Sequence, residues 1–430
     1  MAQSKHSGRA CPRLTRSGLV AAFLATAGVV ASEPSARADG LVRCWGAGSG
    51  SKGSPNYGQS FVPADLGNCA SVAGGRQHSI AIRSDGIVRC WGDETYGQCD
   101  TPADLGTCTS VAGGLYHTIA VRSDGIVRCW GWNKYGQCNT PSDLGPCSSI
   151  AGGWVHTIAL RSDGIVRCWG LNYEGQCTTP ADLKTCTSVA GGFAHTIALQ
   201  SDGTVRCWGW SIFGQCSTPK DLGTCSSIAA GDLHTIALQT DGIVRCWGNN
   251  DYGQCYTPSD LGTCSSVAGG GYHTVALRRD GTVRSWGWNK YGQCNTPSDL
   301  GTCSSIAGGA WHTIVIVPLD TDGDGRPDAT DNCPTIANPT QADCNNNGVG
   351  DACELAAGAA DINGDTIPDT CQCIADLFVD RQVNGADLGA LLAFWGPVNP
   401  GFPQADMNRD GKVDGADLGY LLNAWGPCPN

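Results

Sequence analysis

Acidic side chains between Asp320 and Asp331 have the spacing of a calcium-binding loop. The segment reads DTDGDGRPDATD and has a glycine at its sixth position, where a sharp turn is needed. Calcium takes oxygen ligands at alternating loop positions, and carboxylates packed this closely repel one another without a cation. We therefore predict a calcium site. Its ligands are Asp320, Asp322, Asp324, the carbonyl of Arg326, Asp328 and Asp331.

Two later segments repeat this spacing with weaker ligand sets. The first consists of Asp343, Asn345, Asn347, Asp351 and Glu354. The second consists of Asp361, Asn363, Asp365 and Asp369, with Gln372 at the twelfth position. Cys333, Cys344 and Cys353 lie among these loops and can supply covalent support, but their spacing does not say which of them pair. We expect residues 318–373 to be a calcium-ordered spacer.

A duplicated unit of a loop and a short apolar helix occupies residues 376–426. The second copy has the full ligand pattern: Asp406, Asn408, Asp410, the carbonyl of Lys412, Asp414 and Asp417. The first copy has Phe378 and Arg381 where a ligand and the turn glycine are expected. The second loop is therefore predicted to bind calcium, and the first is left open. The helices GADLGALL and GADLGYLL either pack against each other or form a docking surface.

Histidines recur once in each of seven internal units and have no unique partner. They end a GG-x-x-H element, which becomes AG-x-x-H at His234. A catalytic histidine is expected once, beside a unique nucleophile or acid, so we predict a structural hydrogen-bonding role and no catalytic residue. A polysaccharide-degrading enzyme is the alternative, but it needs two convergent carboxylates. Most acids of the repeats are instead regular turn aspartates.

Cysteines of the units fall into three classes, exemplified by Cys207, Cys216 and Cys225. Ser60 replaces the second class in the first unit, and Ser285 replaces the first class in the last unit. One hypothesis pairs each first-class cysteine with the second-class cysteine of the next unit, because no cysteine of either class is then left over. Pairing within a unit would leave Cys44 and Cys294 alone. Third-class cysteines are expected to be small buried apolar residues.

Composition and the first residues indicate an exported protein. Basic residues precede an apolar run, Gly18–Ala31, and Ala36-Arg37-Ala38 is a cleavage signal, so residues 1–38 are predicted to be a signal peptide. The apolar run is too short to span a bilayer, and no membrane span is expected. The 26 cysteines suggest disulfides in an oxidising compartment, either outside the cell or in its envelope. A net charge of −12 argues against nucleic-acid binding.

The repeated unit positions these residues. The CWG tripeptide recurs at a period of 39 residues from Cys90 onward, which is typical of solenoids and propellers. In each unit HTIALR and IVRCWG are predicted strands joined by an Asp-Gly turn, and SSIAGG supplies a third strand. The segment from YGQC to T-P-x-D-L is expected to be an irregular crossing.

The ends of the repeat region complete the fold prediction. Leu41–Gly46 is a lone third strand, and Ser304–Val317 supplies only first and second strands. We therefore predict an all-β, seven-bladed propeller of short three-stranded blades over residues 39–317, closed by the amino-terminal strand. The calcium spacer at 318–373 and a small helical, EF-hand-like module at 374–430 follow it.

These motifs resemble known families. The repeat V-x-x-WG-x-N-x-x-GQ, followed by A-x-G-x-x-H-T, is similar to the regulator of chromosome condensation family. Its length is similar to secreted propellers of the beta-lactamase inhibitor protein II type. Residues 320–373 resemble thrombospondin type 3 repeats, and 376–426 resemble a dockerin, which implies calcium and a cohesin-like partner. One fold supports many functions, so the family's nuclear exchange activity is not carried over.

Variable positions within the units suggest the function. The residues before each histidine and after each WG include many aromatics, and equivalent positions of a ring lie on one face. We expect a non-catalytic protein-binding face, with packing between blades as the structural alternative and a carbohydrate-binding face as the functional one. The predicted partner-binding residues are Tyr116, Trp132, Trp154, Phe193, Trp210, Tyr272, Trp288 and Trp311.

Overall fold

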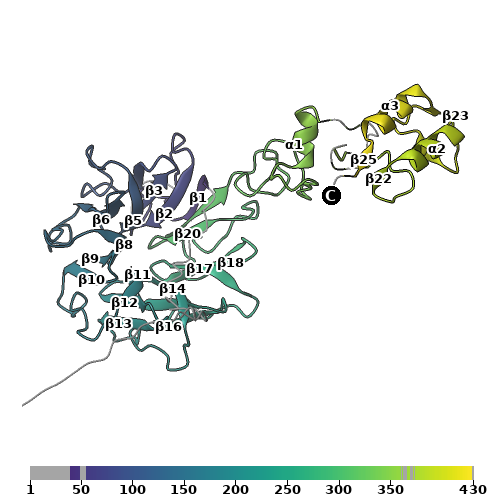
Figure 1. Cartoon of the computed structure of the whole chain (residues 1–430). Coiled ribbons are helices and arrows are strands. Elements are labelled where there is room, and N and C mark those ends of the chain that lie inside the picture. Colours follow the sequence, from purple (N-terminus) through teal and green to yellow (C-terminus); the bar gives the residue numbers. More distant parts are fainter. Residues whose placement is uncertain are drawn as a thin grey trace, which may run out of the picture. The chain divides into compact units, whose positions relative to one another are not determined.

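Residues 39–48, 55–359, 361, 366–368, 371 and 373–428 are described by a computed structural model of the chain (Figure 1). The predicted signal peptide, residues 1–38, lies outside them. Within the described residues, no helix is long and apolar enough to cross a membrane.

The repeat region consists of three-stranded antiparallel units, as the sequence predicts. The first strands are β2 (Cys69–Gly74), β5 (Cys108–Gly113), β8 (Cys147–Gly152), β11 (Cys186–Gly191), β14 (Cys225–Ala230), β17 (Cys264–Gly269) and β20 (Ser305–Gly308). The second strands are β3 (His78–Arg83), β6 (His117–Arg122), β9 (His156–Arg161), β12 (His195–Gln200), β15 (His234–Gln239), β18 (His273–Arg278) and β21 (His312–Pro318). The third strands are β4 (Val88–Gly92), β7 (Val127–Gly131), β10 (Val166–Gly170), β13 (Val205–Gly209), β16 (Val244–Gly248), β19 (Val283–Gly287) and β1 (Gly40–Gly46).

Strand β1 lies beside the last repeat strands, far from it in sequence (Figure 1). It pairs with β21 from Gly40 opposite Pro318 to Gly46 opposite His312. This pairing gives β20 and β21 the third strand that their own segment lacks, in the order β20-β21-β1. The same sheet continues through β2, β3 and β4, with Gly40 opposite Cys69 at the junction.

Apolar side chains are buried between consecutive units. One such cluster joins Ile158 and Leu160 of β9 to Val189 of β11 and Trp208 of β13. A matching cluster contains residues of the first and last units, including Val42, Trp91 and Ile314. The CWG tryptophans are buried in these clusters or packed against them. The leucines of the T-P-x-D-L segments are buried, except Leu183, which is partly buried against the core. The segment expected to be an irregular crossing therefore also contributes to the core.

The carboxy-terminal residues form short elements. They are α1 (Asp351–Ala356), β22 (Gln382–Val383), α2 (Gly385–Ala393), β23 (Gly396–Pro397), η2 (Pro403–Ala405), β24 (Lys412–Val413), α3 (Gly415–Asn423) and β25 (Gly426–Pro427). β22 pairs with β25, and β23 pairs with β24, so each copy of the duplicated unit is paired with the other. Leu391 and Leu421, from α2 and α3, are fully buried in one shared core.

Candidate functional site: aromatic loops and acidic loops

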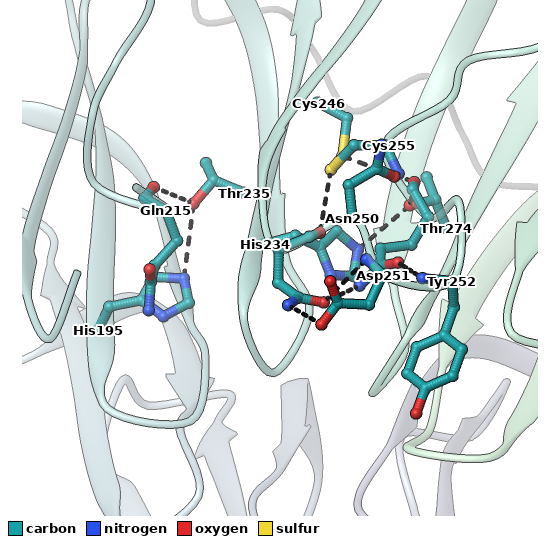
Figure 2. Close-up of a disulfide and its surroundings, with 12 residues drawn as sticks. His195, Gln215, His234, Thr235, Cys246, Asn250, Asp251, Tyr252, Cys255 and Thr274 are labelled. Carbon is teal, nitrogen blue, oxygen red and sulfur yellow. Dashed lines mark hydrogen bonds between the residues drawn. A yellow bond between two sulfur atoms is a disulfide. The ribbon is translucent and has the colours of Figure 1, made fainter. Parts of the chain in front are cut away.

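The repeated histidines hold consecutive units together. Each is fully buried, and its Nε2 lies 2.9–3.5 Å from a hydroxyl of the next unit. Figure 2 shows this contact for His195 and Thr235. The Thr235 hydroxyl donates to the Gln215 carbonyl oxygen at 2.8 Å, so it accepts from the histidine Nε2–H. Burial lowers the pKa of His195 to about 3, which keeps the ring neutral. The predicted structural role agrees with these contacts.

The histidine contact also links the last unit to the first. His312 Nε2 lies 2.9 Å from the hydroxyl of Ser79, which occupies the threonine position of the first unit. The backbone N–H of Ala310 donates to the carbonyl of Gly75 at 3.3 Å, and Arg43 forms an exposed ion pair with Asp299. These three contacts have counterparts between consecutive repeats elsewhere in the chain.

Disulfides of the repeats form within a unit, and the hypothesis of pairing between neighbouring units is wrong. The bonds are Cys90–Cys99, Cys129–Cys138, Cys207–Cys216 and Cys246–Cys255 (the last in Figure 2). The turn after CWG returns the second-class cysteine to its own third strand, with Cα atoms about 5 Å apart in each pair. These separations range from 4.9 to 5.0 Å.

The remaining cysteines of the repeats are free, and they include Cys168 and Cys177, which occupy the two pairing positions of one unit without a bond between them. Cys44 and Cys294 are free because serines occupy their partner positions, and Ser60 donates instead to the Ala47 carbonyl. Third-class cysteines are buried and free, as expected. In the tail, the bonds that the sequence left open are Cys333–Cys353, Cys344–Cys371 and Cys373–Cys428.

Strand register brings the variable loop positions to one end of each unit. In β12 and β13, His195 lies opposite Gly209, so the turn before the histidine and the loop after WG are neighbours. The predicted aromatic residues at both places are partly exposed and contact one another. The centroids of Trp154 and Phe193 are 4.2 Å apart, and those of Phe193 and Trp210 are 5.6 Å apart.

Two further aromatic groups contain the other predicted residues. Tyr116 and Trp132 are 6.0 Å apart, as are Tyr272 and Trp288. Trp311 joins the second group through Tyr291, at 6.3 Å. Sequence reasoning missed the aromatic residue two positions before the buried glutamine in five of the units, where the motif reads YGQC or FGQC. These residues are Tyr96, Tyr135, Phe213, Tyr252 and Tyr291, and each contacts one of the groups.

Glycine pairs from six repeats, and the corresponding Ala230-Gly231 pair of the seventh, line a cavity of about 130 Å³. Arg76, Trp154 and Asp232 are the large polar or aromatic side chains at its wall. The Arg76 guanidinium carbon lies 5.0 Å from the Trp154 ring and 4.9 Å from the Trp311 ring. Trp154 Nε1 donates to Asp232 Oδ1 at 2.8 Å. Burial raises the pKa of Asp232 to about 6, against the lowering effects of this hydrogen bond and of Arg76.

The first acidic loop brings three of its six predicted calcium ligands together. Carboxylate oxygens of Asp320, Asp322 and Asp324 all lie within 4.8 Å of one another. Buried oxygens of Asp322 and Asp331 have no hydrogen-bond donor. Removal from water raises the pKa of Asp322, and the neighbouring carboxylates raise it further. Asp328 is turned toward Thr321, whose N–H and hydroxyl donate to it. Hard oxygen donors left without partners fit a calcium ion.

The next two loops differ in how much of their pattern the structure describes. Asn345 and Asn347 donate to the Glu354 carboxylate at 3.0 and 2.7 Å, so these three side chains lie together. Asp351 is buried at the start of α1 and accepts from the N–H of Cys344 in the same loop. In the third loop Asp361 accepts from Thr366 N–H. Its other candidates, Asn363, Asp365 and Asp369, lie outside the described residues.

Both duplicated loops adopt the same backbone turn. Asp406 accepts from Asp410 N–H and Gly411 N–H, and Asp376 accepts from Asp380 N–H and Arg381 N–H. Gly411 has φ +91° and Arg381 has φ +66°, a region that costs energy for a residue with a side chain. At the twelfth position, Asp417 accepts from Met407 N–H and Asp414 N–H. Asn408 Nδ2 donates to Asp410, and the Lys412 carbonyl belongs to β24.

Comparison with known protein families identifies two kinds of repeat in the chain. Six segments match the description "Regulator of chromosome condensation (RCC1) repeat", at residues 69–98, 108–137, 147–176, 186–215, 225–254 and 264–293. The chain carries RCC1 repeats. Residues 319–341 match the thrombospondin type 3 repeat, a calcium-binding motif. No curated protein sequence matches the chain.

Solved structures similar to the chain are RCC1-like propellers. Prp20p from Saccharomyces cerevisiae has a TM-score of 0.58 at 19% identity, over 67% of this chain and 94% of Prp20p. Human WBSCR16 has a TM-score of 0.55 at 19% identity, over 65% of this chain and 100% of WBSCR16. At identities this low, the structural likeness shows a shared fold alone. The repeated three-stranded units are therefore consistent with an RCC1-like propeller.

Proposed function

We propose that the chain is an exported, non-catalytic binding protein whose repeats form a closed seven-bladed propeller with one protein-binding face. Contacts between the first and last units support closure, above all the pairing of β1 with β21. The single observation that carries the function is the gathering of partly exposed aromatic rings into three groups at one end of the strand units. Tyrosine and tryptophan anchors of this kind dominate protein interfaces.

The similar structures support a protein partner. One is described with its binding properties to Gsp1p and histones, and another is yeast RCC1 (Prp20) bound to Kap60. That second structure is 18% identical over 74% of this chain and 98% of its own, with a TM-score of 0.58. Disulfides and a thrombospondin repeat are features of extracellular proteins, so an extracellular or envelope partner is proposed here.

Capture by the full chain tests this function. Immobilised full-length protein should retain one identifiable protein from the native extracellular and envelope fraction. Trp132→Ala and Trp288→Ala should each weaken this capture by tenfold or more, because a buried aromatic anchor contributes about 2 kcal/mol or more. The control is Tyr256→Ala, since Tyr256 is an exposed aromatic outside the three groups. Retention of a glycan instead of a protein, or equal capture by all variants, would contradict the proposal.

The tail is proposed to be a calcium-dependent spacer, residues 318–373, followed by a dockerin-like module, residues 374–430. Orphaned oxygens of Asp322 and Asp331 support calcium binding by the first loop. In the module, Leu392 and Trp395 are half exposed, and so are their duplicated counterparts Leu422 and Trp425. These side chains are free for attachment to a partner, for which the dockerin resemblance suggests a cohesin-like protein.

Calcium removal tests the tail. In chelator, limited proteolysis of the full chain should cleave within residues 318–430 and leave residues 39–317 intact, since like charges in the loops then repel. Asp324→Asn should weaken calcium binding measured by calorimetry about tenfold, whereas Asp260→Asn, which removes an exposed repeat carboxylate, should not. Equal protease resistance with and without calcium would refute a calcium-ordered tail.

A further inference from the structure

At the cavity lined by the glycine pairs, two units carry a charged side chain: Arg76 in one and Asp232 in the other. The residue that follows the pair is Arg76, Leu115, Trp154, Phe193, Asp232, Gly271 or Ala310 in successive units. Arg76 and Asp232 both line the cavity, yet no ion pair within 4.0 Å joins them among the described residues. Gly271 and Ala310, which have little or no side chain, also line the cavity.

Backbone N–H groups at this cavity already have acceptors. Arg76 N–H donates to Gly114 O, Trp154 N–H to Gly192 O and Asp232 N–H to Gly271 O, with the same pattern in the other units. The N–H groups of the glycines before them, such as Gly75, donate to the histidine carbonyls. A ligand in the cavity would therefore be recognised by side chains, and Arg76 and Asp232 are the charged ones.

Arg76 is held in place but forms no direct ion pair among the described residues. Its guanidinium lies against two indole rings, and its Nη1 is 3.5 Å from the Tyr116 hydroxyl. Its Nε is buried and has no acceptor, and no carboxylate of the described residues forms an ion pair with it. A guanidinium offers a rigid fork that fits a carboxylate with two parallel hydrogen bonds. Asp232 is engaged by Trp154 and does not fill this fork.

We propose that the cavity receives the carboxylate of an acidic side chain on the partner, with the Arg76 guanidinium as the group that recognises it. This inference rests on the proposed protein-binding function, because the surrounding aromatic groups supply the contact area that a single side chain lacks. A monoanion fits better than a dianion such as phosphate. Asp232 lies on the same wall, and the chain's net charge of −12 repels a second negative charge more strongly.

A small probe tests the site without the partner. N-acetyl-aspartate N-methylamide is titrated into the ¹⁵N-labelled full chain while the Arg76 Nε–H and Trp154 Nε1–H resonances are followed. A ligand of this size should give a saturable shift with a Kd on the order of 1–10 mM. The neutral asparagine analogue should give none. Arg76→Gln should abolish the shift, and Arg279→Gln, which changes an exposed arginine, should leave it unchanged.

Each outcome decides a separate question. An equal shift with the asparagine analogue or with Arg76→Gln, or no shift at all, would overturn the carboxylate site. Tighter binding of inorganic phosphate than of the aspartate probe would overturn the preference for a monoanion. If a captured partner loses affinity in Trp132→Ala and Trp288→Ala but not in Arg76→Gln, the protein-binding face stands and this inference fails. A tenfold or greater loss in Arg76→Gln supports both.

Discussion

At the scale of single residues, the recurring histidines link neighbouring units. Each ring donates from Nε2 to a hydroxyl, and that hydroxyl donates to the backbone carbonyl of a glutamine. Three residue types thus form one link between neighbouring units. Recurrence allowed the structural role of the histidine to be predicted. The glutamine was missed, because a polar residue in an irregular segment gives no sign that it will be fully buried, as Gln176 is.

A glycine beside each histidine is required by this link. A Cβ on Gly192 would clash with the His195 ring and would lie 2.7 Å from the Gly231 carbonyl oxygen. Gly192→Ala should therefore lower the free energy of unfolding by about 1–3 kcal/mol, measured by thermal or denaturant melts. Gly389→Ala is the control, because a Cβ there meets no atom within 4 Å and alanine favours the helix. If Gly192→Ala left the free energy of unfolding unchanged, the histidine ring would have to move freely.

At the scale of elements, the three strands of each unit could be predicted, whereas the cysteine pairing could not. Asp-Gly turns between β-branched runs define the hairpins, and the structure has them. The pairing hypothesis used only the count of unpaired cysteines, which cannot measure how far the loop after WG folds back. Cys207 and Cys216 meet because that loop reverses within one unit. The Arg76 cluster was likewise beyond prediction, since Trp154 and Trp311 belong to distant units.

Disulfides within units lead to a local stability prediction. Removing one with Cys207→Ser and Cys216→Ser together should cost about 2–3 kcal/mol, the loop-closure value for a short loop. Peptide mapping without reduction should recover Cys207 joined to Cys216, and Cys246 joined to Cys255. The first and last units provide a natural comparison, since Ser60 and Ser285 replace one cysteine of each pair. Recovery of Cys207 joined to Cys255 would instead restore the inter-unit hypothesis.

At the scale of the whole molecule, the buried histidines should make the repeat region sensitive to acid. Burial lowers the pKa of all seven to about 3 or 4. In the unfolded chain their pKa is about 6.5, so the unfolded state binds more protons between these values. Stability is therefore fully present above about pH 6.5 and is lost as the pH falls toward 4. Burial raises the pKa of Asp232, so this carboxyl has the opposite effect on the pH dependence of stability, but it is one group against seven histidines.

Melting temperatures of the full chain between pH 7.5 and 4 check this expectation. Each histidine contributes a slope of up to about 1.4 kcal/mol per pH unit, and His195→Gln should remove one such contribution. Tryptophan fluorescence reports the repeats, because 12 of the 14 tryptophans precede residue 318. A melting temperature that stays constant from pH 7 to pH 4.5 would mean that the histidines are not the acid-sensitive groups.

The placement of β1 has a consequence for how the chain folds during synthesis. This strand leaves the ribosome before every other strand of the repeats, yet its partner is β21, and the ion pair between Arg43 and Asp299 spans 256 residues. A contact of such sequence separation forms slowly, because a long loop must close before any bond rewards it. Until then β21 presents an unpaired edge that invites a strand from another molecule. A chaperone that shields this edge would therefore protect the chain most in the last step of folding.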